Sequence, residues 1–264
     1  LAGFSAFEVL SYRWGVASIV LIVFGWLSGC NFRLAGKDWG VVFLLSLLRA
    51  VTSFSLIIAY QNIASGVAST IHFMYPLAVA LAMMFFFREK KSLLVILAVL
   101  MSLLGAALLS LGELEAKSGN TMVGLVAACV SVFSYAGYIV GVRTTRVVQI
   151  NSTALTCYVM GLGTIFYLIG AYCTSGLQLV SDGYTWLIIL GLALPATAIS
   201  NITLVQAIKY AGPTLTSILG AMEPLTAVVI GVFVFKELFT VNSAVGIILI
   251  LLAVSIVVFR RQKS

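Results

Sequence analysis

The amino-acid sequence predicts an all-α polytopic membrane protein made of two inverted repeats of about five transmembrane helices each. Three observations favour this fold class: an apolar composition, a series of apolar segments of membrane-spanning length, and a similarity between the two halves of the chain. The 264 residues are 62% hydrophobic and only 9% charged, whereas a soluble domain carries about 25% charged residues. So few charges cannot cover a water-facing surface of this size, and lipid is therefore the expected solvent.

Nine segments have the length and apolarity of a membrane helix, which needs about 20 mainly apolar residues. In chain order they cover residues 7–28, 39–60, 64–87, 93–112, 122–142, 152–174, 185–210, 212–235 and 243–259. The connectors are short and hold most of the charged and turn-forming residues, as at residues 31–38, 88–91 and 143–146. Pro213 opens the eighth segment, where the missing N–H of a proline removes no helix hydrogen bond.

Lysine and arginine residues are distributed unevenly between the two sides that these nine segments define. With the C-terminal tail in the cytoplasm, 11 of the 15 fall on the cytoplasmic side and only Lys117 and Lys236 on the other. This asymmetry follows the positive-inside rule and predicts a multi-pass protein of the cell (inner) membrane with a cytoplasmic C-terminus. Nucleic-acid binding is disfavoured despite the net charge of +7, because the basic residues form no continuous face.

A shift of 148 residues aligns two stretches of the sequence. Pro76 and Leu77 fall on Pro224 and Leu225, and Phe-Arg-Glu at 87–89 falls on Phe-Lys-Glu at 235–237. The aligned segments are five spans apart, and an odd step reverses the direction in which a helix crosses the membrane. We therefore expect an N-terminal repeat over residues 1–119 and an inverted repeat over residues 120–264, an arrangement typical of secondary transporters.

Three stretches carry a resemblance to a known family. They are Phe-Ser-Ala-Phe-Glu-Val-Leu-Ser-Tyr-Arg at 4–13, Met-Tyr-Pro-Leu at 74–77 with Arg88 and Glu89, and Ala-Met-Glu-Pro-Leu at 221–225 with Lys236 and Glu237. With them the chain resembles the EamA family of bacterial permeases in the drug/metabolite transporter superfamily. The resemblance implies ten helices in full length, so this chain is expected to lack the first. It also implies that segments 93–112 and 243–259 are peripheral and that the others surround a central cavity.

Ionisable residues inside the spans are the first candidates for a binding site, because a charge in the bilayer core costs about 2.5–3.5 kcal/mol on insertion scales. Arg49 and Glu223 lie 10 and 11 residues past the starts of their spans, so both are about 15–16 Å deep. Two interpretations stay open: a structural ion pair between the halves, or a site in which Arg49 holds an anionic group and Glu223 binds an ammonium group or a proton. An ion pair that opens on binding would satisfy both interpretations.

Three more ionisable residues occupy membrane segments. Arg13 lies about 9 Å below the outer surface and is expected to be an outer-side charge that is able to snorkel outward. Glu8 lies near the boundary, where we expect water to solvate it. His72 is the only histidine; it is either a hydrogen-bonded structural residue or a proton relay, because histidine titrates near neutral pH.

Prolines and polar side chains also mark the expected cavity. Pro76, Pro195 and Pro224 each remove one helix hydrogen bond and predict helix kinks, which would free carbonyls such as that of Gly220; plain packing kinks are the alternative. Polar residues recur at helical spacing in segments 122–142 and 185–210, although such residues also serve to bridge helices. The predicted substrate-binding residues of the central cavity are Arg49, His72, Tyr75, Tyr135, Tyr138, Asn201 and Glu223.

The sequence favours a secondary transporter over other functions of a membrane protein. It contains no ATP-binding loop of the GxxxxGK[ST] form, so a gradient, with protons as a candidate, or passive flow would drive transport. The resemblance implies a small metabolite such as an amino acid or its derivative as substrate, and export as the direction. The alternatives are a channel, a non-transporting membrane sensor or, less favoured, an intramembrane enzyme. No cofactor or metal is expected, because the four cysteines form no CxxC pair or Cys/His cluster.

Overall fold

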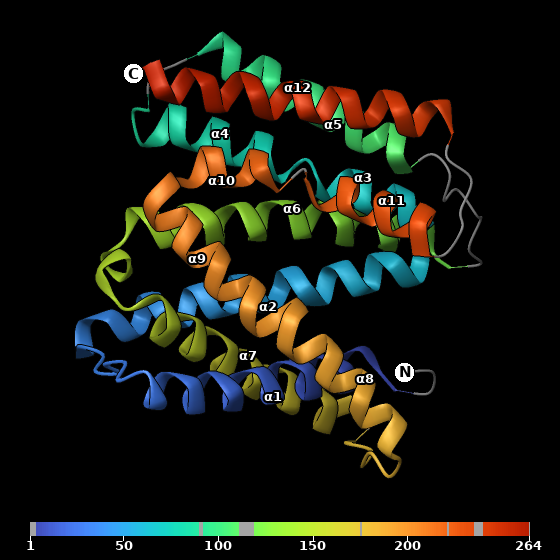
Figure 1. Cartoon of the computed structure of the whole chain (residues 1–264). Coiled ribbons are helices and arrows are strands. Elements are labelled where there is room, and N and C mark those ends of the chain that lie inside the picture. The colour runs from blue at the N-terminus through green and yellow to red at the C-terminus, as the bar shows by residue number, and fades with distance from the viewer. Residues whose placement is uncertain are drawn as a thin grey trace. The chain divides into compact units, whose positions relative to one another are not determined.

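The structure, a computed structural model, describes residues 4–89, 92–110, 119–174, 176–220, 222–234 and 240–263. Most of these residues are helical and none lies in a strand (Figure 1). Six helical segments within the described ranges are long and apolar enough to cross a membrane: Ala6–Leu27, Gly36–Asn62, Ser65–Phe86, Thr121–Thr144, Ser152–Thr174 and Gly183–Ala211. The predicted all-α polytopic fold class is confirmed.

All nine predicted spans fall on helical segments. The six long segments comprise α1 (Ala6–Leu27), η1 (Gly36–Asp38) with α2 (Trp39–Asn62), α3 (Ser65–His72) with α4 (Tyr75–Phe86), α6 (Thr121–Thr144), α7 (Ser152–Thr174), and α8 (Gly183–Ala193) with η4 (Leu194–Ile199) and α9 (Ser200–Ala211). The remaining predicted spans correspond to α5 (Leu93–Ser110), α10 (Pro213–Leu219) with α11 (Met222–Val234), and α12 (Val241–Lys263). A 3-10 turn, η3 (Arg146–Gln149), lies between α6 and α7. Residues 111, 112, 221 and 235 of the predicted spans lie outside the described residues.

Three of the predicted spans are interrupted near a proline. Pro76 lies in the first turn of α4, just after the interruption between α3 and α4. Pro224 lies in the first turn of α11, just after the interruption between α10 and α11, and Pro195 lies in η4, a π-helix that separates α8 from α9. Pro224 was expected to remove the helix hydrogen bond to the Gly220 carbonyl, which then needs another partner. The Glu223 N–H supplies it at 3.0 Å, because the chain turns locally.

The start of α1 is fixed by a capping box. The Ser5 hydroxyl oxygen accepts from the Glu8 N–H at 3.3 Å, and the Ser5 N–H donates to Glu8 Oε2 at 2.7 Å. The other carboxylate oxygen, Oε1, accepts from the Gln178 N–H at 2.7 Å. Glu8 is 1% exposed, so the expectation that water solvates it is wrong, because backbone N–H groups take the place of water.

Packing divides the chain into two compact units, which we describe separately. Unit 1 comprises Leu1–Phe54 and Gly141–Tyr210, and unit 2 comprises Ser55–Val140 and Ala211–Ser264. Unit 1 therefore contains α1, most of α2, α7, α8 and α9, and unit 2 contains α3 to α5, most of α6, and α10 to α12. Each unit takes segments from both predicted repeats, and the repeat boundary between residues 119 and 120 stays a prediction.

In unit 1, α1 packs along α7 (Figure 1). Trp14 is 2% exposed and fills the space that Gly163 leaves, since a Cβ at position 163 would lie 2.2 Å from the Trp14 ring. Gly170 leaves room for Phe7 in the same way, with a Cβ there lying 2.5 Å from the Phe7 ring. Small residues that let helices approach closely are how membrane helices associate without a hydrophobic driving force.

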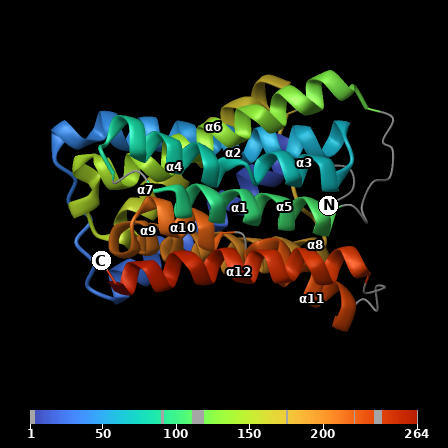
Figure 2. The ribbon, with the colours of Figure 1, turned by 90° about the horizontal axis from the view of Figure 1, so that it is seen from above.

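In unit 2, α5 runs alongside α12 (Figure 2). The two helices approach so closely that a Cβ at Gly105 would lie 2.7 Å from the Gly246 carbonyl oxygen. Ala98, Ile218 and Ala253, from α5, α10 and α12, form part of the buried core beside them. These two helices are the ones that the family resemblance expects to be peripheral.

Large apolar side chains cover much of the outside of the units. Trp26 is 78% exposed, Phe86 80% and Leu93 84%. Such exposure is a liability in water, but in a bilayer these side chains contact lipid, as the composition predicts.

Contacts between connectors agree with helices that cross alternately up and down. In unit 1, the connectors that follow α1 and α6 line one pocket. Arg143 Nη1, at the end of α6, donates to the Lys209 carbonyl near the end of α9 at 2.7 Å, and the Lys209 ammonium donates to the Ile150 carbonyl. If the helices cross the membrane alternately up and down, the C-terminal ends of α1, α6 and α9 lie on the same side. The contacts between these ends are consistent with that arrangement.

Candidate functional site

Unit 1 contains a polar group within its helix packing, which we call the arginine cluster: Arg13, Trp14, Arg49, Thr197 and Asn201. Arg49 projects from the middle of α2 and is half-buried. Its Nε donates to Asn201 Oδ1 at 3.2 Å, and its Nη1 donates to the Ser53 hydroxyl at 3.1 Å. Its guanidinium carbon lies 6.0 Å from the centroid of the Trp14 ring, the outer limit of a cation–π contact. Neighbours from α1, α2 and α9 thus orient this guanidinium group.

The second arginine of the cluster binds the π-helix η4. Arg13 Nε donates to the Thr197 hydroxyl at 2.5 Å, and Arg13 Nη2 donates to the Ala196 carbonyl at 3.1 Å. The same Thr197 hydroxyl donates to the Leu192 carbonyl at 2.8 Å. Single π-helical turns inside α-helices occur frequently at functional sites. Arg13 thus contacts this interruption, and its place as an outer-side charge stays a prediction.

Thr197 binds Arg13 and Asn201 binds Arg49, so both arginines contact one face of the helical segment formed by η4 and α9. Thr197 and Asn201 are four residues apart, and Asn201 Nδ2 donates to the Thr197 carbonyl at 2.7 Å. Both are buried, at 1% and 2% exposure. Two guanidinium groups oriented by neutral oxygen atoms suit recognition of a carboxylate or a phosphate, because the planar N–H fork matches paired oxygen acceptors.

Unit 2 contains a second group, which we call the aromatic cluster: His72, Tyr75, Tyr135 and Tyr138. The His72 ring stacks on Tyr135 with centroids 5.5 Å apart and lies 5.4 Å from Tyr75. Tyr75 meets Tyr135 edge-on at 4.6 Å, and Tyr135 is parallel to Tyr138 at 6.5 Å. All four centroid distances lie within the range of attractive ring contacts. His72 ends α3, Tyr75 begins α4, and the other two occupy one face of α6, so the interruption between α3 and α4 builds the cluster.

His72 is held by a serine from α6. Its Nδ1 lies 2.9 Å from the Ser131 hydroxyl, and that hydroxyl donates to the Ala128 carbonyl at 2.6 Å. A serine hydroxyl carries a single proton, so we assign the proton between His72 and Ser131 to Nδ1 of the imidazole. His72 is therefore hydrogen-bonded, as one of its two interpretations expects.

The interruption between α10 and α11 lies against the aromatic cluster. Gly220 is beside the Tyr75 hydroxyl, and a Cβ at this position would overlap that hydroxyl. Glu223 follows in the first turn of α11 with its side chain exposed. An acidic residue in the first turn of a helix interacts favourably with the helix dipole.

The structure thus distributes the predicted binding residues over the two units. It brings His72, Tyr75, Tyr135 and Tyr138 together in unit 2, and it joins Arg49 to Asn201 in unit 1. Because Arg49 lies in unit 1 and Glu223 in unit 2, an ion pair between them stays a prediction.

The sequence alone does not indicate Trp14 of the arginine cluster or the packing role of Gly220 beside the aromatic cluster. Trp14 lies within an apolar run, where an aromatic residue cannot be told from an ordinary core residue; its neighbour Arg13 was the only signal. Gly220 was noted for its carbonyl, whereas its lack of a side chain is what admits Tyr75. Within the described ranges, no group of three His, Cys, Asp or Glu residues is placed to hold a metal ion.

The fold and the two clusters define the class of this protein as a polytopic α-helical membrane protein with polar groups gathered at interruptions in its spans. Comparison with known families makes this more specific. The chain belongs to the EamA-like transporter family, whose sequence model matches residues 1–111 and 122–259, and it is thus a membrane transporter of the drug/metabolite superfamily.

Comparison with individual proteins adds evidence on the fold. One crystal structure of a protein superimposes with a TM-score of 0.81 at 17% sequence identity, over 97% of this chain and 88% of that chain. At this identity the likeness shows a shared fold only. No curated protein matches the sequence.

Proposed function

We propose that this protein is a secondary transporter that moves a small metabolite, such as an amino acid or its derivative, out of the cell by alternating access. The aromatic cluster at the two interruptions in unit 2 is the observation that carries the proposal. Rings gathered beside a buried histidine favour an organic cation or an amphipathic metabolite, because the face of an aromatic ring attracts an ammonium group. The arginine cluster in unit 1 favours a carboxylate. Amino acids and their derivatives carry groups of either kind, so each cluster by itself suits this class of substrate.

The relation between the interruptions supports alternating access. The 148-residue shift places the interruption between α3 and α4 on the interruption between α10 and α11. Interrupted helices at corresponding positions of two inverted repeats are where secondary transporters bind their substrates, and rocking of one part against another exposes such sites to each side in turn. The repeats in this proposal are residues 1–119 and 120–264.

The proposed setting is the cell (inner) membrane with the C-terminus in the cytoplasm, supported by the uneven distribution of lysine and arginine. A proton gradient is the candidate energy source. A reporter fused after residue 264 and a second one inserted near Gln178 should report opposite sides of the membrane; the same side for both would contradict the topology.

Transport is tested by counterflow of labelled amino acids into liposomes that contain the purified chain. Saturable counterflow, accelerated by unlabelled substrate inside, is expected of a carrier. An ohmic current without saturation would identify a channel and contradict the proposal. Ligand-induced thermal stabilisation without any flux would instead identify a membrane sensor. Replacing Tyr135 with Ala should raise the half-saturating concentration of an amine-bearing substrate about tenfold, because one cation–π contact is lost.

A further inference from the structure

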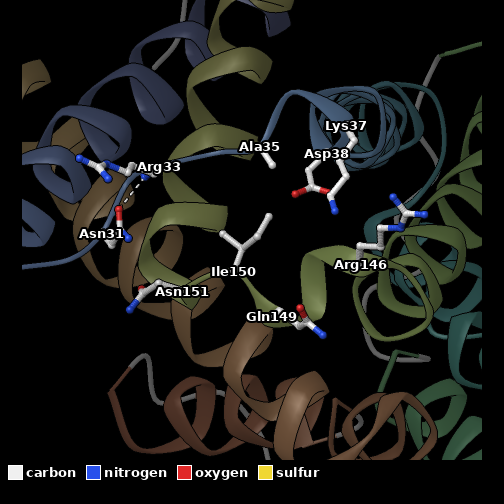
Figure 3. Close-up of a pocket in the computed structure, with 9 residues that line it drawn as sticks. All are labelled: Asn31, Arg33, Ala35, Lys37, Asp38, Arg146, Gln149, Ile150 and Asn151. Carbon is white, nitrogen blue, oxygen red and sulfur yellow. Dashed lines mark hydrogen bonds between the residues drawn. The ribbon is translucent and has the colours of Figure 1, made fainter.

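A pocket of about 720 Å³ opens in unit 1 between the connector that follows α1 and the connector that follows α6 (Figure 3). Its charged lining residues are Arg33, Lys37 and Asp38 from the first connector and Arg146 from the second. Asp38 and Ile150 extend toward the middle of the pocket from opposite connectors (Figure 3). None of these residues belongs to the arginine cluster or the aromatic cluster, so this connector pocket is separate from the candidate transport site.

The charges in the connector pocket lack protein partners. In the described part of the chain, the side chains of Arg33, Lys37 and Arg146 make no hydrogen bond or ion pair. Asp38 Oδ1 is buried and receives no hydrogen bond from any described residue. The positive-inside rule accounts for cations in a cytoplasmic connector, but it does not account for a buried carboxylate oxygen without a donor, which is costly. The pocket therefore suits a ligand that carries both an anionic group and a hydrogen-bond donor.

Aromatic residues indicate the depth of the connector pocket. Trp39 directly follows Asp38 at the start of α2, is 45% exposed, and lies 5.5 Å, centroid to centroid, from the Tyr158 ring. The Tyr158 hydroxyl donates to the Phe32 carbonyl in the first connector. Tryptophan and tyrosine with this mixed apolar and polar environment concentrate at the level of the lipid headgroups. By this criterion the pocket is expected to open at the level of the lipid phosphate groups.

We propose that the connector pocket binds the headgroup of a membrane phospholipid that bears a hydrogen-bond donor, such as phosphatidylethanolamine. The phosphate binds among Arg33, Lys37 and Arg146, and the headgroup ammonium donates to the Asp38 carboxylate. Basic pockets at the cytoplasmic ends of membrane helices are suited to phospholipid headgroups. A soluble phosphate ester has the same chemistry, but the headgroup-level position favours the lipid. The inference requires only that the chain spans a membrane, and it is independent of what the protein transports.

The test measures binding to the purified full chain in detergent, using four probes: short-chain phosphatidylethanolamine, short-chain phosphatidylcholine, phosphoethanolamine and inorganic phosphate. Phosphatidylethanolamine should bind about tenfold more tightly than phosphatidylcholine, whose quaternary ammonium has no N–H to donate. Asp38→Leu, which has a similar shape but no hydrogen-bond acceptor, should remove this preference. Arg146→Gln should weaken binding of both lipids about tenfold through loss of a charge-assisted hydrogen bond.

The matched control for Arg146→Gln is Arg88→Asn. Arg88 is an exposed cation in the connector after α4, outside the pocket, and asparagine tolerates its backbone φ of 55°. An equal loss of lipid affinity in both variants would overturn the site in favour of general charge attraction. Phosphoethanolamine binding as tightly as the lipid would overturn the lipid as occupant. Circular dichroism and size exclusion verify the fold, and Arg33→Gln replaces Arg146→Gln if the latter is misfolded.

Discussion

The hydroxyl of Tyr75 occupies the space beside Gly220, where a Cβ would lie only 1.8 Å from the hydroxyl oxygen. Tyr75 begins α4 after one interrupted span, and Gly220 lies between α10 and α11 in the other. The 148-residue shift relates these two interruptions, so equivalent parts of the predicted repeats contact each other within unit 2. The aromatic cluster therefore packs directly against the interruption between α10 and α11.

Gly220→Ala should lower both stability and transport. No methyl group fits between the backbone and the Tyr75 ring, so Tyr75 or the α10–α11 turn must shift, and overpacking of this kind costs about 1–3 kcal/mol. The measurement is the free energy of unfolding in detergent together with the counterflow rate in liposomes. Gly161→Ala in α7 is the control, because a Cβ there meets nothing within 4 Å and alanine favours a helix over glycine.

Combining Gly220→Ala with Tyr75→Phe tests the cause of that loss. Removing the hydroxyl removes the closest overlap, and the next neighbours lie 3.0 Å away at the Ser217 carbonyl and 3.1 Å away at the ring carbon Cζ. The double variant should recover part of the stability lost by Gly220→Ala, which a double-mutant cycle detects as coupling. Additive changes in the free energy of unfolding would mean that the methyl group of Ala at position 220 and the Tyr75 hydroxyl do not compete for the same space.

Ser131→Ala should destabilise the aromatic cluster. The substitution removes the 2.9 Å hydrogen bond between the Ser131 hydroxyl and the buried His72 ring, and losing a buried hydrogen bond of this kind costs about 1–3 kcal/mol. The control is Ser102→Ala in α5, because that buried hydroxyl donates to the carbonyl of Val99 in its own helix and should contribute less. The measurement is the thermal unfolding of both variants. Equal small losses of stability would show that the hydrogen bond between His72 and Ser131 does not fix the imidazole ring in place.

The spans could be predicted from the sequence because the bilayer requires a minimum apolar length, and each predicted segment is helical. The way in which three of these spans are interrupted could not be predicted from the sequence. Residues 64–87 and 212–235 have the composition of continuous helices, and a proline predicts only one missing hydrogen bond, whereas the chain separates α3 from α4 and α10 from α11. The π-helix at Leu194–Ile199 contains Thr197, whose hydroxyl accepts from Arg13, 184 residues away in sequence, so local sequence does not report this contact.

The sequence predicts residues of the candidate site only where their spacing along one helix gives their face or their depth in the membrane. Helical periodicity places Tyr135 and Tyr138 on one face of α6, and depth arguments select Arg49 as a residue within the membrane. Neither argument pairs His72 with Ser131, because that neighbour comes from tertiary packing. Glu8 was misjudged for a similar reason: the backbone N–H of Gln178 that replaces water is 170 residues away in sequence.

Arg49→Lys should reduce transport of a substrate that bears a carboxylate about tenfold. The lysine keeps the charge but cannot reproduce the planar fork that donates to both Asn201 and Ser53, and loss of a charge-assisted hydrogen bond has about this effect. The measurement is the half-saturating concentration in counterflow, compared between an amino acid and its decarboxylated amine. An equal loss for both compounds would contradict recognition of the carboxylate and leave a structural role for Arg49.

Thr197→Val should loosen the π-helix. Valine keeps the shape of threonine but loses the hydroxyl that accepts from Arg13 and donates to the Leu192 carbonyl, at a cost of about 1 kcal/mol. Thr203→Val is the control, because its exposed hydroxyl donates to the Ile199 carbonyl, and surface substitutions usually change stability by less than about 0.5 kcal/mol. Hydrogen exchange of the backbone amides at residues 194–201 should rise in the first variant and stay unchanged in the second.

Glu223→Gln should abolish transport or uncouple it from a proton gradient while leaving a folded protein in the membrane. The side chain lies in the first turn of α11, exposed and next to the Gly220 turn, so an amide fits the same space without binding a proton or an ammonium group. Glu223→Asp keeps the charge and should retain pH-dependent flux. The measurement is uptake into liposomes with and without an imposed pH gradient. If the Gln variant keeps normal pH-dependent uptake, Glu223 carries no proton, and the structural ion pair becomes its remaining role.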